Sequence, residues 1–257
     1  MILAIDVGNT NIVFGGINDG VTSFITRLNT DKEKTEDEYA VMFKTLIGLN
    51  GMHKNDFDGG IISSVVPQLN EVLKKAVQKI IGREPLIVGP GIKTGLNIKI
   101  DNPATLGSDI VVGCVAAIAK YPKPLIVIDM GTATTIVVVD KSCVYRGGVI
   151  IPGVKVAMDS LTRNAAQLQS ISLDAPKKAI GTNTADCMRS GVVFGNAAMI
   201  DGMIDRLSEE IEGKPTIIAT GGLSPKIIPN CRHRIILDDD LLIKGLEIIY
   251  NKNHSEI

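Results

Sequence analysis

Hydrophobic residues along this chain occur in two patterns. Short continuous apolar runs alternate with segments in which apolar residues recur at helical spacing. Runs rich in β-branched residues predict buried strands. They cover Ile2–Asp6, Asn11–Ile17, Val21–Leu28, Gly60–Val65, Leu86–Val88, Leu125–Asp129, Thr135–Asp140, Cys143–Ile151 and Thr216–Thr220. The helical stripes predict helices over Thr35–Gly48, Asn70–Ile81, Asp109–Lys120, Val154–Ala166, Thr184–Ile211 and Asp238–Asn251. Gly82 ends the second helix, and His254–Ile257 is expected to be a frayed tail. The pattern therefore predicts an α/β fold.

Two segments of the chain repeat one pattern. Each has an apolar strand, an aspartate, a glycine turn with hydroxyl or amide residues, and a second apolar strand. The aspartates are Asp6 and Asp129, the glycines are Gly8 and Gly131, and each segment heads about half of the chain. Ligands of α/β sheets bind where strands end, and glycine lets the backbone approach a ligand closely. We expect two such hairpins to face each other across a cleft that suits a nucleotide phosphate chain and its metal.

The turn residues suit phosphate oxygens. Neutral donors come from Asn9, Thr10, Asn11, Thr132, Thr134 and Thr135. Neither turn contains a lysine, which excludes the GxxxxGK[ST] phosphate loop and implies that Mg²⁺ held through the aspartates offsets the phosphate charge. Either turn alone is equally typical of an ordinary β-turn. Their occurrence as a pair favours the phosphate site.

A third glycine segment and a further aspartate add to this set. The strand ending at Thr220 runs into Gly221 and Gly222, a step that lets a planar adenine lie flat against backbone. Asp109 opens a helix, where the dipole favours the ionised carboxylate, and it is the candidate general base. Simple helix capping by Ser108 and Asp109 is the alternative interpretation.

Composition narrows the class of protein. A net charge of −1 without basic runs argues against nucleic-acid binding. Four scattered cysteines without a CxxC pair argue against a zinc site and favour free thiols in a reducing cytosol. Apolar runs stay below the roughly 18–20 residues that a membrane span needs, and the N-terminus has no basic region of a signal peptide. We therefore expect a cytoplasmic protein.

The motifs together resemble those of a known family. Asp-x-Gly-Asn-Thr, Asp-x-Gly-Thr-Ala-Thr-Thr and Ala-Thr-Gly-Gly are similar to the phosphate-1, phosphate-2 and adenosine motifs of the acetate kinase, sugar kinase, Hsp70 and actin superfamily. The chain is identified as a type III pantothenate kinase by the further segments Lys93–Asn97, Asp101–Pro103, Leu106–Asp109, Gly147–Gly153 and Gly181–Thr184. This resemblance implies a duplicated actin-like ATPase fold with ribonuclease-H-like lobes at residues 1–105 and 106–257. It also implies a homodimer.

The resemblance implies ATP-dependent phosphorylation of pantothenate, the first step toward coenzyme A. Asp109 would accept the hydroxyl proton, Asp129 would bind K⁺ or NH₄⁺, and Asp6 would organise Mg²⁺, directly or through water. The implied ATP contacts are Asp6, Val7, Gly8, Asn9, Thr10, Asn11, Ile12, Val13, Gly131, Thr132, Gly221 and Gly222. The implied pantothenate contacts are Ile100, Gly107, Ser108, Asp109, Ile110 and Thr184.

Two positions depart from the family pattern on the acceptor side. Ile110 stands where the family has an arginine, and Ile100 stands where it has a tyrosine. Isoleucine cannot replace a forked donor to a carboxylate or a hydroxyl. Two alternatives stay open: a kinase or phosphatase of the same fold acting on another small acceptor, and a non-catalytic nucleotide-sensing regulator. The apolar positions Met188, Val192, Met199, Ile200 and Met203 fit either a dimer interface or the core.

Overall fold

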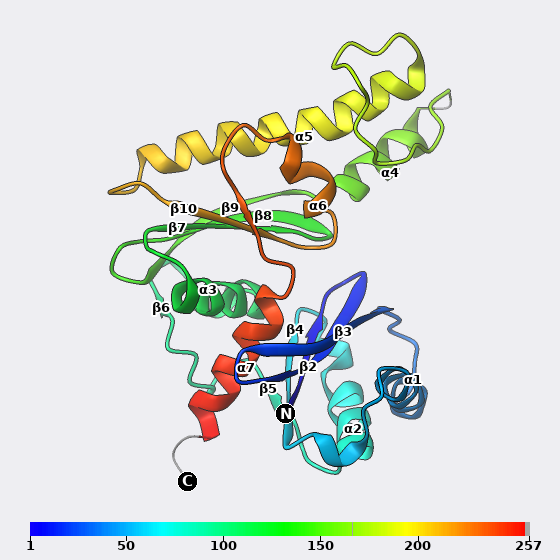
Figure 1. The fold of residues 1–257 in the computed structure, drawn as a ribbon, viewed down its shortest axis with the longest axis vertical. Helices are drawn as coiled ribbons and strands as arrows, with labels where there is room; N and C mark the ends of the chain where they lie inside the picture. The colour runs from blue at the N-terminus through cyan, green and yellow to red at the C-terminus, as the bar shows by residue number, and fades with distance from the viewer. Residues whose placement is uncertain (166, 255–257) are drawn as a thin grey trace. The chain divides into compact units, whose positions relative to one another are not determined.

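The computed structural model describes residues 1–165 and 167–254, which form two compact units (Figure 1). Unit 1 comprises Met1–Leu96, Asp101–Ala119 and the chain from Asp240 on. Unit 2 comprises Asn97–Ile100 and Lys120–Asp239. Within the described ranges, none of the helices combines the length and the apolar character needed to span a membrane.

Unit 1 is built on a mixed sheet in the order β3-β2-β1-β4-β5. β1 pairs antiparallel with β2 and parallel with β4. The strands are β1 (Ile2–Val7), β2 (Asn11–Asn18), β3 (Val21–Asn29), β4 (Gly59–Ser64) and β5 (Leu86–Ile87), and the helices are α1 (Glu36–Leu49), α2 (Asn70–Ile81), α3 (Ser108–Lys120) and α7 (Leu241–His254). Short 3₁₀ turns cover Lys54–Asp56, Pro67–Leu69 and Pro103–Thr105.

Successive side chains of β1 point to opposite faces of the sheet, so both faces of this strand take part in the layers of unit 1. Leu3 and Ile5 point to one face, where they join a core with Phe43 of α1 and Leu73 of α2. The opposite face of β1, β2 and β4 contacts α7, and a side chain at Gly59 would collide with the Tyr250 ring of that helix. The C-terminal helix therefore completes the layered core of the N-terminal sheet.

Unit 2 contains a second mixed sheet in the order β11-β10-β7-β8-β9-β6. Its strands are β6 (Asn97–Ile98), β7 (Leu125–Met130), β8 (Ala133–Val139), β9 (Val144–Pro152), β10 (Thr216–Thr220) and β11 (Ile236–Leu237). Its helices are α4 (Val154–Asn164), α5 (Thr184–Glu209) and α6 (Ser224–Ile227), with a 3₁₀ turn at Ile228–Asn230. Figure 1 shows the long α5 along one face of this sheet, where its buried residues share a core with β7, β8 and β10.

The two sheets have the same topology. The order β9-β8-β7-β10-β11 in unit 2 repeats β3-β2-β1-β4-β5 in unit 1, and β6 adds one strand at the β9 edge. The β1–β2 and β7–β8 pairs are antiparallel, while β1–β4 and β7–β10 are parallel. The internal repeat and the duplicated α/β fold expected from the sequence are confirmed.

Most predicted elements occur within a few residues of their expected bounds. The short β6, β11 and α6 were not predicted, because segments of two to four residues carry too little pattern. Helix α4 ends at Asn164, and residue 166 of its predicted range lies outside the described residues. The predicted tail is wrong at His254, which belongs to α7, and residues 255–257 lie outside the described residues.

The structure groups the chain differently from the predicted lobes of residues 1–105 and 106–257. Helices α3 and α7 fall in the predicted second lobe but are grouped with the N-terminal segments in unit 1, except for the last residue of α3. A helix pattern in sequence does not reveal which sheet the helix accompanies. The division into lobes at residues 1–105 and 106–257 stays a prediction.

Candidate functional site

The first aspartate–glycine turn closes the β1–β2 hairpin of unit 1. Asp6 lies opposite Val13 of β2 and beside Ser63 of β4, one residue before the end of β1. The Gly8 amide donates to the Asn11 carbonyl at 2.9 Å. The tip of the turn is exposed, so its backbone N–H groups are accessible to an anion.

Ser108 fixes the start of α3 against the carboxyl end of β4. Its hydroxyl accepts from the Ser64 amide at 3.0 Å, donates to the Ser64 carbonyl at 3.0 Å and contacts the Ser63 hydroxyl at 3.0 Å. Ser63 is the register neighbour of Asp6. The structure therefore brings Asp109, the residue after Ser108, to the same edge of the unit 1 sheet as Asp6.

Burial determines the proton affinity of Asp109. Desolvation raises the pKa of its carboxyl, although the carboxylate accepts a hydrogen bond from the Ile110 amide at 2.8 Å. The pKa is raised because desolvation outweighs the backbone hydrogen bonds that stabilise the charged form. The predicted effect of the helix dipole on this carboxylate stays a prediction. A raised pKa makes the carboxylate a stronger proton acceptor, as general-base catalysis requires.

The second aspartate–glycine turn closes the β7–β8 hairpin of unit 2. Asp129 lies opposite Thr135 of β8 and beside Thr220 of β10. The Gly131 amide donates to the Ala133 carbonyl at 3.0 Å, two residues further along the chain, whereas the bond across the first turn spans three residues. Gly131 and Thr132 are exposed. This turn therefore has the aspartate–glycine arrangement of the first turn but is one residue shorter.

Two glycines pack against the second turn. The Gly153 amide donates to the Thr132 carbonyl at 3.1 Å, and no side chain would fit at Gly153 beneath the turn. Gly221 has a φ of +97°, and a Cβ there would lie 2.6 Å from Oδ1 of Asp129 and 2.6 Å from the Met130 amide nitrogen. The adenosine-motif glycine is therefore in direct contact with the phosphate-2 aspartate.

The residues present fit a nucleotide phosphate and a hydrated metal ion. The hydroxyl oxygen of Thr134, directly after the second turn, is buried and has no hydrogen-bond partner in the described part of the chain. No group of three or more His, Cys, Asp or Glu side chains that could hold a metal occurs in residues 1–165 and 167–254. Mg²⁺ commonly binds through one or two carboxylates, waters and substrate phosphates, which matches one aspartate near the end of each strand, Asp6 in β1 and Asp129 in β7.

The predicted pantothenate contacts are distributed over several elements. Gly107 to Ile110 lie at the start of α3 in unit 1, whereas Ile100 follows β6 and Thr184 begins α5 in unit 2. Asn183 is the N-cap of α5 and accepts from the Asp186 amide at 2.9 Å. Thr184, the first residue of the helix, is exposed.

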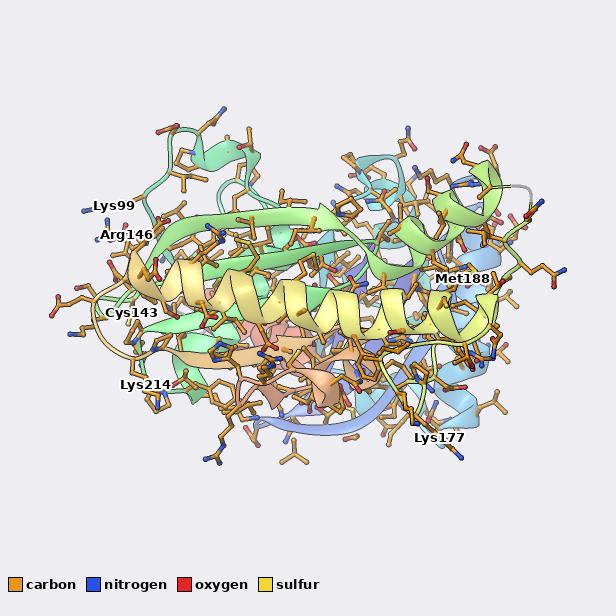
Figure 2. The ribbon with its side chains drawn as sticks, turned by 90° about the horizontal axis from the view of Figure 1, so that it is seen from above. Lys99, Cys143, Arg146, Lys177, Met188 and Lys214 are labelled. Carbon is orange, nitrogen blue, oxygen red and sulfur yellow. The ribbon has the colours of Figure 1, made fainter. Side chains whose placement is uncertain are left out.

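Thr184 lines an apolar hollow of about 430 Å³ between α4 and α5. Met158 and Leu161 of α4 and Met188 of α5 contribute to its walls. A larger hollow of about 670 Å³ lies beside Arg146 at the other end of α5 (Figure 2). Its charges already form ion pairs, including Arg146 with Asp140 at 2.6 Å. The smaller hollow is therefore the stronger acceptor-side candidate.

The apolar stripe of α5 belongs to the core. Met188 and Ile200 are buried, and Val192, Met199 and Met203 pack against the unit 2 core. These positions therefore contribute to the core of unit 2, and the dimer-interface interpretation stays a prediction. Further apolar residues of unit 2 are exposed, namely Ile150 of β9, Val156 and Leu161 of α4, and Ile180.

Sequence reasoning missed the residues that support the two turns. Thr30 contacts the first turn, Ser63 and Ser64 hold α3, and Gly153 lies under the second turn. Gly153 alone had a signal, as part of a family segment. The other three lie far along the chain from the groups they hold, so local pattern gave no indication of their role.

The chain matches the family model described as "Type III pantothenate kinase" over residues 2–206. A type III pantothenate kinase from Halalkalibacterium halodurans is 44% identical over 98% of this chain and 100% of its own length. Another from Bacillus cytotoxicus is 42% identical over 98% of this chain and 97% of its own length. These matches cover nearly the whole chain.

Solved structures show the same fold at low identity. A protein from Campylobacter jejuni described as a Baf family transcriptional activator has a TM-score of 0.62 and 22% identity, covering 98% of this chain and 99% of its own. The activator of the 2-hydroxyisocaproyl-CoA dehydratase from Clostridium difficile, solved with bound ADPNP, has a TM-score of 0.56 and 9% identity, covering 99% and 94%. At these identities the likeness concerns the fold alone.

Proposed function

Because the chain belongs to the type III pantothenate kinase family, we propose that it transfers the γ-phosphate of ATP to the primary alcohol of pantothenate. This reaction is the first step toward coenzyme A. The observation that carries the proposal is the placement of Asp109 beside the carboxyl edge of the sheet that ends in the Asp6 turn. A proton acceptor and a phosphate-binding turn are thereby held by one rigid framework.

Asp109 takes the proton of the attacking alcohol. As the alcohol oxygen forms its bond to the γ-phosphorus, the bond to the ADP oxygen breaks and the proton passes to the Asp109 carboxylate. Loose phosphoryl transfer depends strongly on positioning, and Ser108 provides it by fixing the start of α3. General-base help of this kind is typically worth about 10²–10⁴ in rate.

The two glycine turns hold the ATP phosphates in this proposal. Asp6 to Val13 and Gly131 with Thr132 supply backbone and side-chain donors, and Gly221 with Gly222 borders the adenosine. Mg²⁺, when bound, offsets the phosphate charge that no lysine in either turn offsets. Asp6 would hold that ion, directly or through water, and Asp129 would hold a monovalent cation, K⁺ or NH₄⁺.

Acceptor recognition is the part of the proposal in which this chain departs from its family. Ile100 and Ile110 provide no charged or hydroxyl donor, and Thr184 and Asn196 are polar residues that line the apolar hollow. A pantothenate carboxylate would gain no ion pair from Ile110. This observation favours a second candidate function, phosphorylation of a related acceptor in which an uncharged amide replaces the carboxylate.

We also propose that the protein acts as a cytoplasmic homodimer. The exposed apolar side chains of Val156, Leu161 and Ile180 support an interface on unit 2, with Ile180 83% exposed. Four free cysteines in the described chain support a reducing compartment. Sedimentation equilibrium tests the dimer: a Leu161→Glu variant should shift it toward monomer, and an unchanged mass would contradict this interface.

The kinase assignment is tested by ADP release from the purified protein with ATP, Mg²⁺ and K⁺. Pantothenate and pantetheine, its neutral amide-extended relative, are supplied in parallel. ADP release that depends on pantothenate supports the main proposal, and a preference for pantetheine supports the second candidate. ATP binding without turnover on either acceptor would contradict both and favour a nucleotide-sensing regulator.

A further inference from the structure

Thr30 holds both ends of the first glycine turn. Its hydroxyl donates to the Gly8 carbonyl at 2.6 Å, and its amide donates to the Thr10 carbonyl at 2.9 Å. Asn11, the first residue of β2, pairs with Asn29, the last residue of β3. Thr30 is therefore the next residue of the same ladder, and it extends the β2–β3 pairing into the turn.

The hydroxyl of Thr30 orients a peptide unit of the turn. A trans peptide is planar, so its C=O and its N–H point in opposite directions. The Gly8 carbonyl shares its peptide with the Asn9 amide. Because Thr30 binds the Gly8 carbonyl, the Asn9 N–H is directed away from Thr30 and toward the outer side of the turn. An outward N–H is the group with which a glycine turn binds phosphate.

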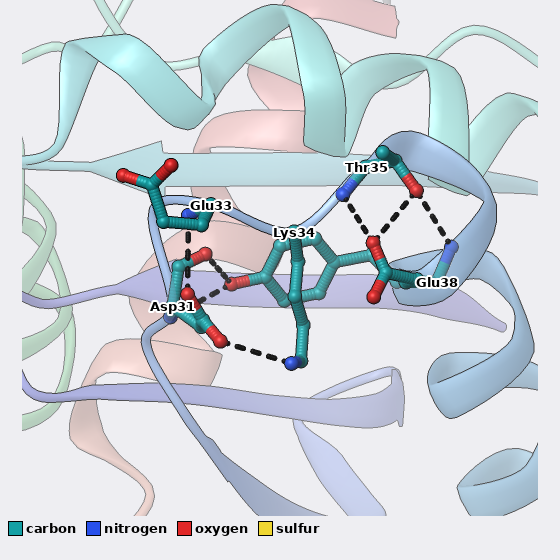
Figure 3. A network of polar contacts seen from close by, with 6 residues as sticks. Asp31, Glu33, Lys34, Thr35 and Glu38 are labelled. Carbon is teal, nitrogen blue, oxygen red and sulfur yellow. Dashed lines mark hydrogen bonds and ion pairs between the residues drawn. The ribbon is translucent and has the colours of Figure 1, made fainter.

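The segment after Thr30 is itself held in place. The Tyr39 hydroxyl accepts from the Asp31 amide at 3.0 Å and donates to the Asp31 carbonyl at 2.7 Å, and the Tyr39 side chain is fully buried. Figure 3 shows that the Asp31 carboxylate also binds the Glu33 amide and the Lys34 amine, at 3.1 and 2.9 Å. The segment is thus anchored to α1 and cannot follow Thr30 if the turn moves.

The start of α1 adds a second anchor. Thr35 and Glu38 form a capping box, in which the Thr35 amide donates to the Glu38 carboxylate at 2.8 Å (Figure 3). The start of α1 and the Asp31 segment are thus each held by hydrogen bonds, and the chain leads from them to Thr30, which binds the turn. Every link belongs to unit 1.

We propose that Thr30 is a positioning residue for nucleotide binding, which fixes the Gly8–Asn11 turn in its phosphate-binding conformation without touching the substrate. This role rests on the ATP-dependent function proposed above. Tyr39 supports it from the core by holding the backbone of Asp31. Loss of the Thr30 hydroxyl should weaken phosphate binding and leave acceptor binding unchanged.

The test compares Thr30→Val, which keeps the shape and removes the hydroxyl, with Thr30→Ser, which keeps the hydroxyl. Thr45→Val is the matched control, because the Thr45 hydroxyl donates to a carbonyl within α1 at 2.8 Å. ATP affinity is measured by isothermal titration calorimetry, and KM is measured for ATP and for the acceptor. One lost hydrogen bond corresponds to a change of about 3- to 10-fold in affinity.

Thr30→Val should weaken ATP binding by about 3- to 10-fold and raise KM for ATP with no change in KM for the acceptor. Thr30→Ser and Thr45→Val should bind ATP like the unmodified protein. Wild-type ATP affinity in a folded Thr30→Val variant would overturn the inference, and so would equal losses for Val and Ser. If Thr30→Val does not fold, Tyr39→Phe should show the same selective rise in KM for ATP. An unchanged KM for ATP in Tyr39→Phe would also overturn the inference. No ATP binding by the unmodified protein would instead refute the proposed function.

Discussion

Replacing Gly221 with alanine places a methyl group against the phosphate-2 aspartate. The new Cβ would lie 2.6 Å from Oδ1 of Asp129 and within 2.7 Å of two backbone atoms of Met130. Favourable contacts between heavy atoms lie at about 3.5–4.0 Å. Because two of the three contacted atoms belong to the backbone of β7, a side-chain rotation cannot relieve the collision.

The cost has two parts that can be estimated separately. A non-glycine residue held at a φ of +97° is strained by about 1–3 kcal/mol. Overpacking of a tight contact adds about 1–3 kcal/mol, so the free energy of unfolding should fall by about 2–6 kcal/mol. At about 2–4 °C per kcal/mol for a protein of this size, the melting temperature should fall by roughly 4–24 °C.

Gly213→Ala is the matched control. Gly213 has a φ of +93°, yet its Cβ would meet the flexible end of the Lys141 side chain instead of backbone. Thermal unfolding and ATP titration are measured for both variants. Gly213→Ala should show the strain alone and bind ATP normally, whereas Gly221→Ala should be less stable and bind ATP more weakly. Equal stability and normal ATP affinity in both variants would refute this reading of the Gly221 contact.

Three further substitutions test other parts of the account. Ser108→Ala leaves the Ser64 amide without its acceptor, so stability should fall by about 1–2 kcal/mol, and kcat should fall without a change in KM for ATP. Asp109→Asn should raise the melting temperature at pH 7, because the raised pKa means that the charged carboxylate destabilises the folded state. This gain in melting temperature should disappear as the pH falls below 3.8, the ordinary pKa of an aspartate carboxyl. Lys120→Met removes a 2.7 Å ion pair with buried Asp238, so the free energy of unfolding, measured by urea unfolding, should fall by about 1–3 kcal/mol. A decrease below about 0.5 kcal/mol would contradict a stabilising role of this ion pair.

The part of the fold that the sequence predicted is the part encoded by local pattern. The strands around Asp6 and Asp129 are continuous apolar runs, and the turns between them contain glycine at the position that the geometry requires. Their duplication in sequence corresponds to a duplication of sheet order. Local pattern and topology agree here because each hairpin folds from adjacent segments.

Contacts between distant segments could not be predicted in the same way. The sequence does not distinguish Thr30 from the other threonines, and only the β2–β3 register shows that it lies against the turn. The sequence predicts that Tyr250 belongs to a C-terminal helix, but it does not predict that this residue packs on Gly59 of the first sheet. The pKa direction at Asp109 also depends on three-dimensional burial, which outweighs the backbone hydrogen bonds to this carboxylate.

The central claim is that Asp109 accepts a proton during pantothenate phosphorylation at an ATP site that is otherwise intact. It is tested most directly by ADP release with and without pantothenate for the unmodified protein and for Asp109→Asn, with ATP affinity measured for both. The account predicts pantothenate-dependent release that falls by about 10²–10⁴-fold in the variant, while ATP affinity stays within about twofold, a change of less than 0.5 kcal/mol. Pantothenate-dependent release that survives in Asp109→Asn, or release that never depends on pantothenate, would contradict it.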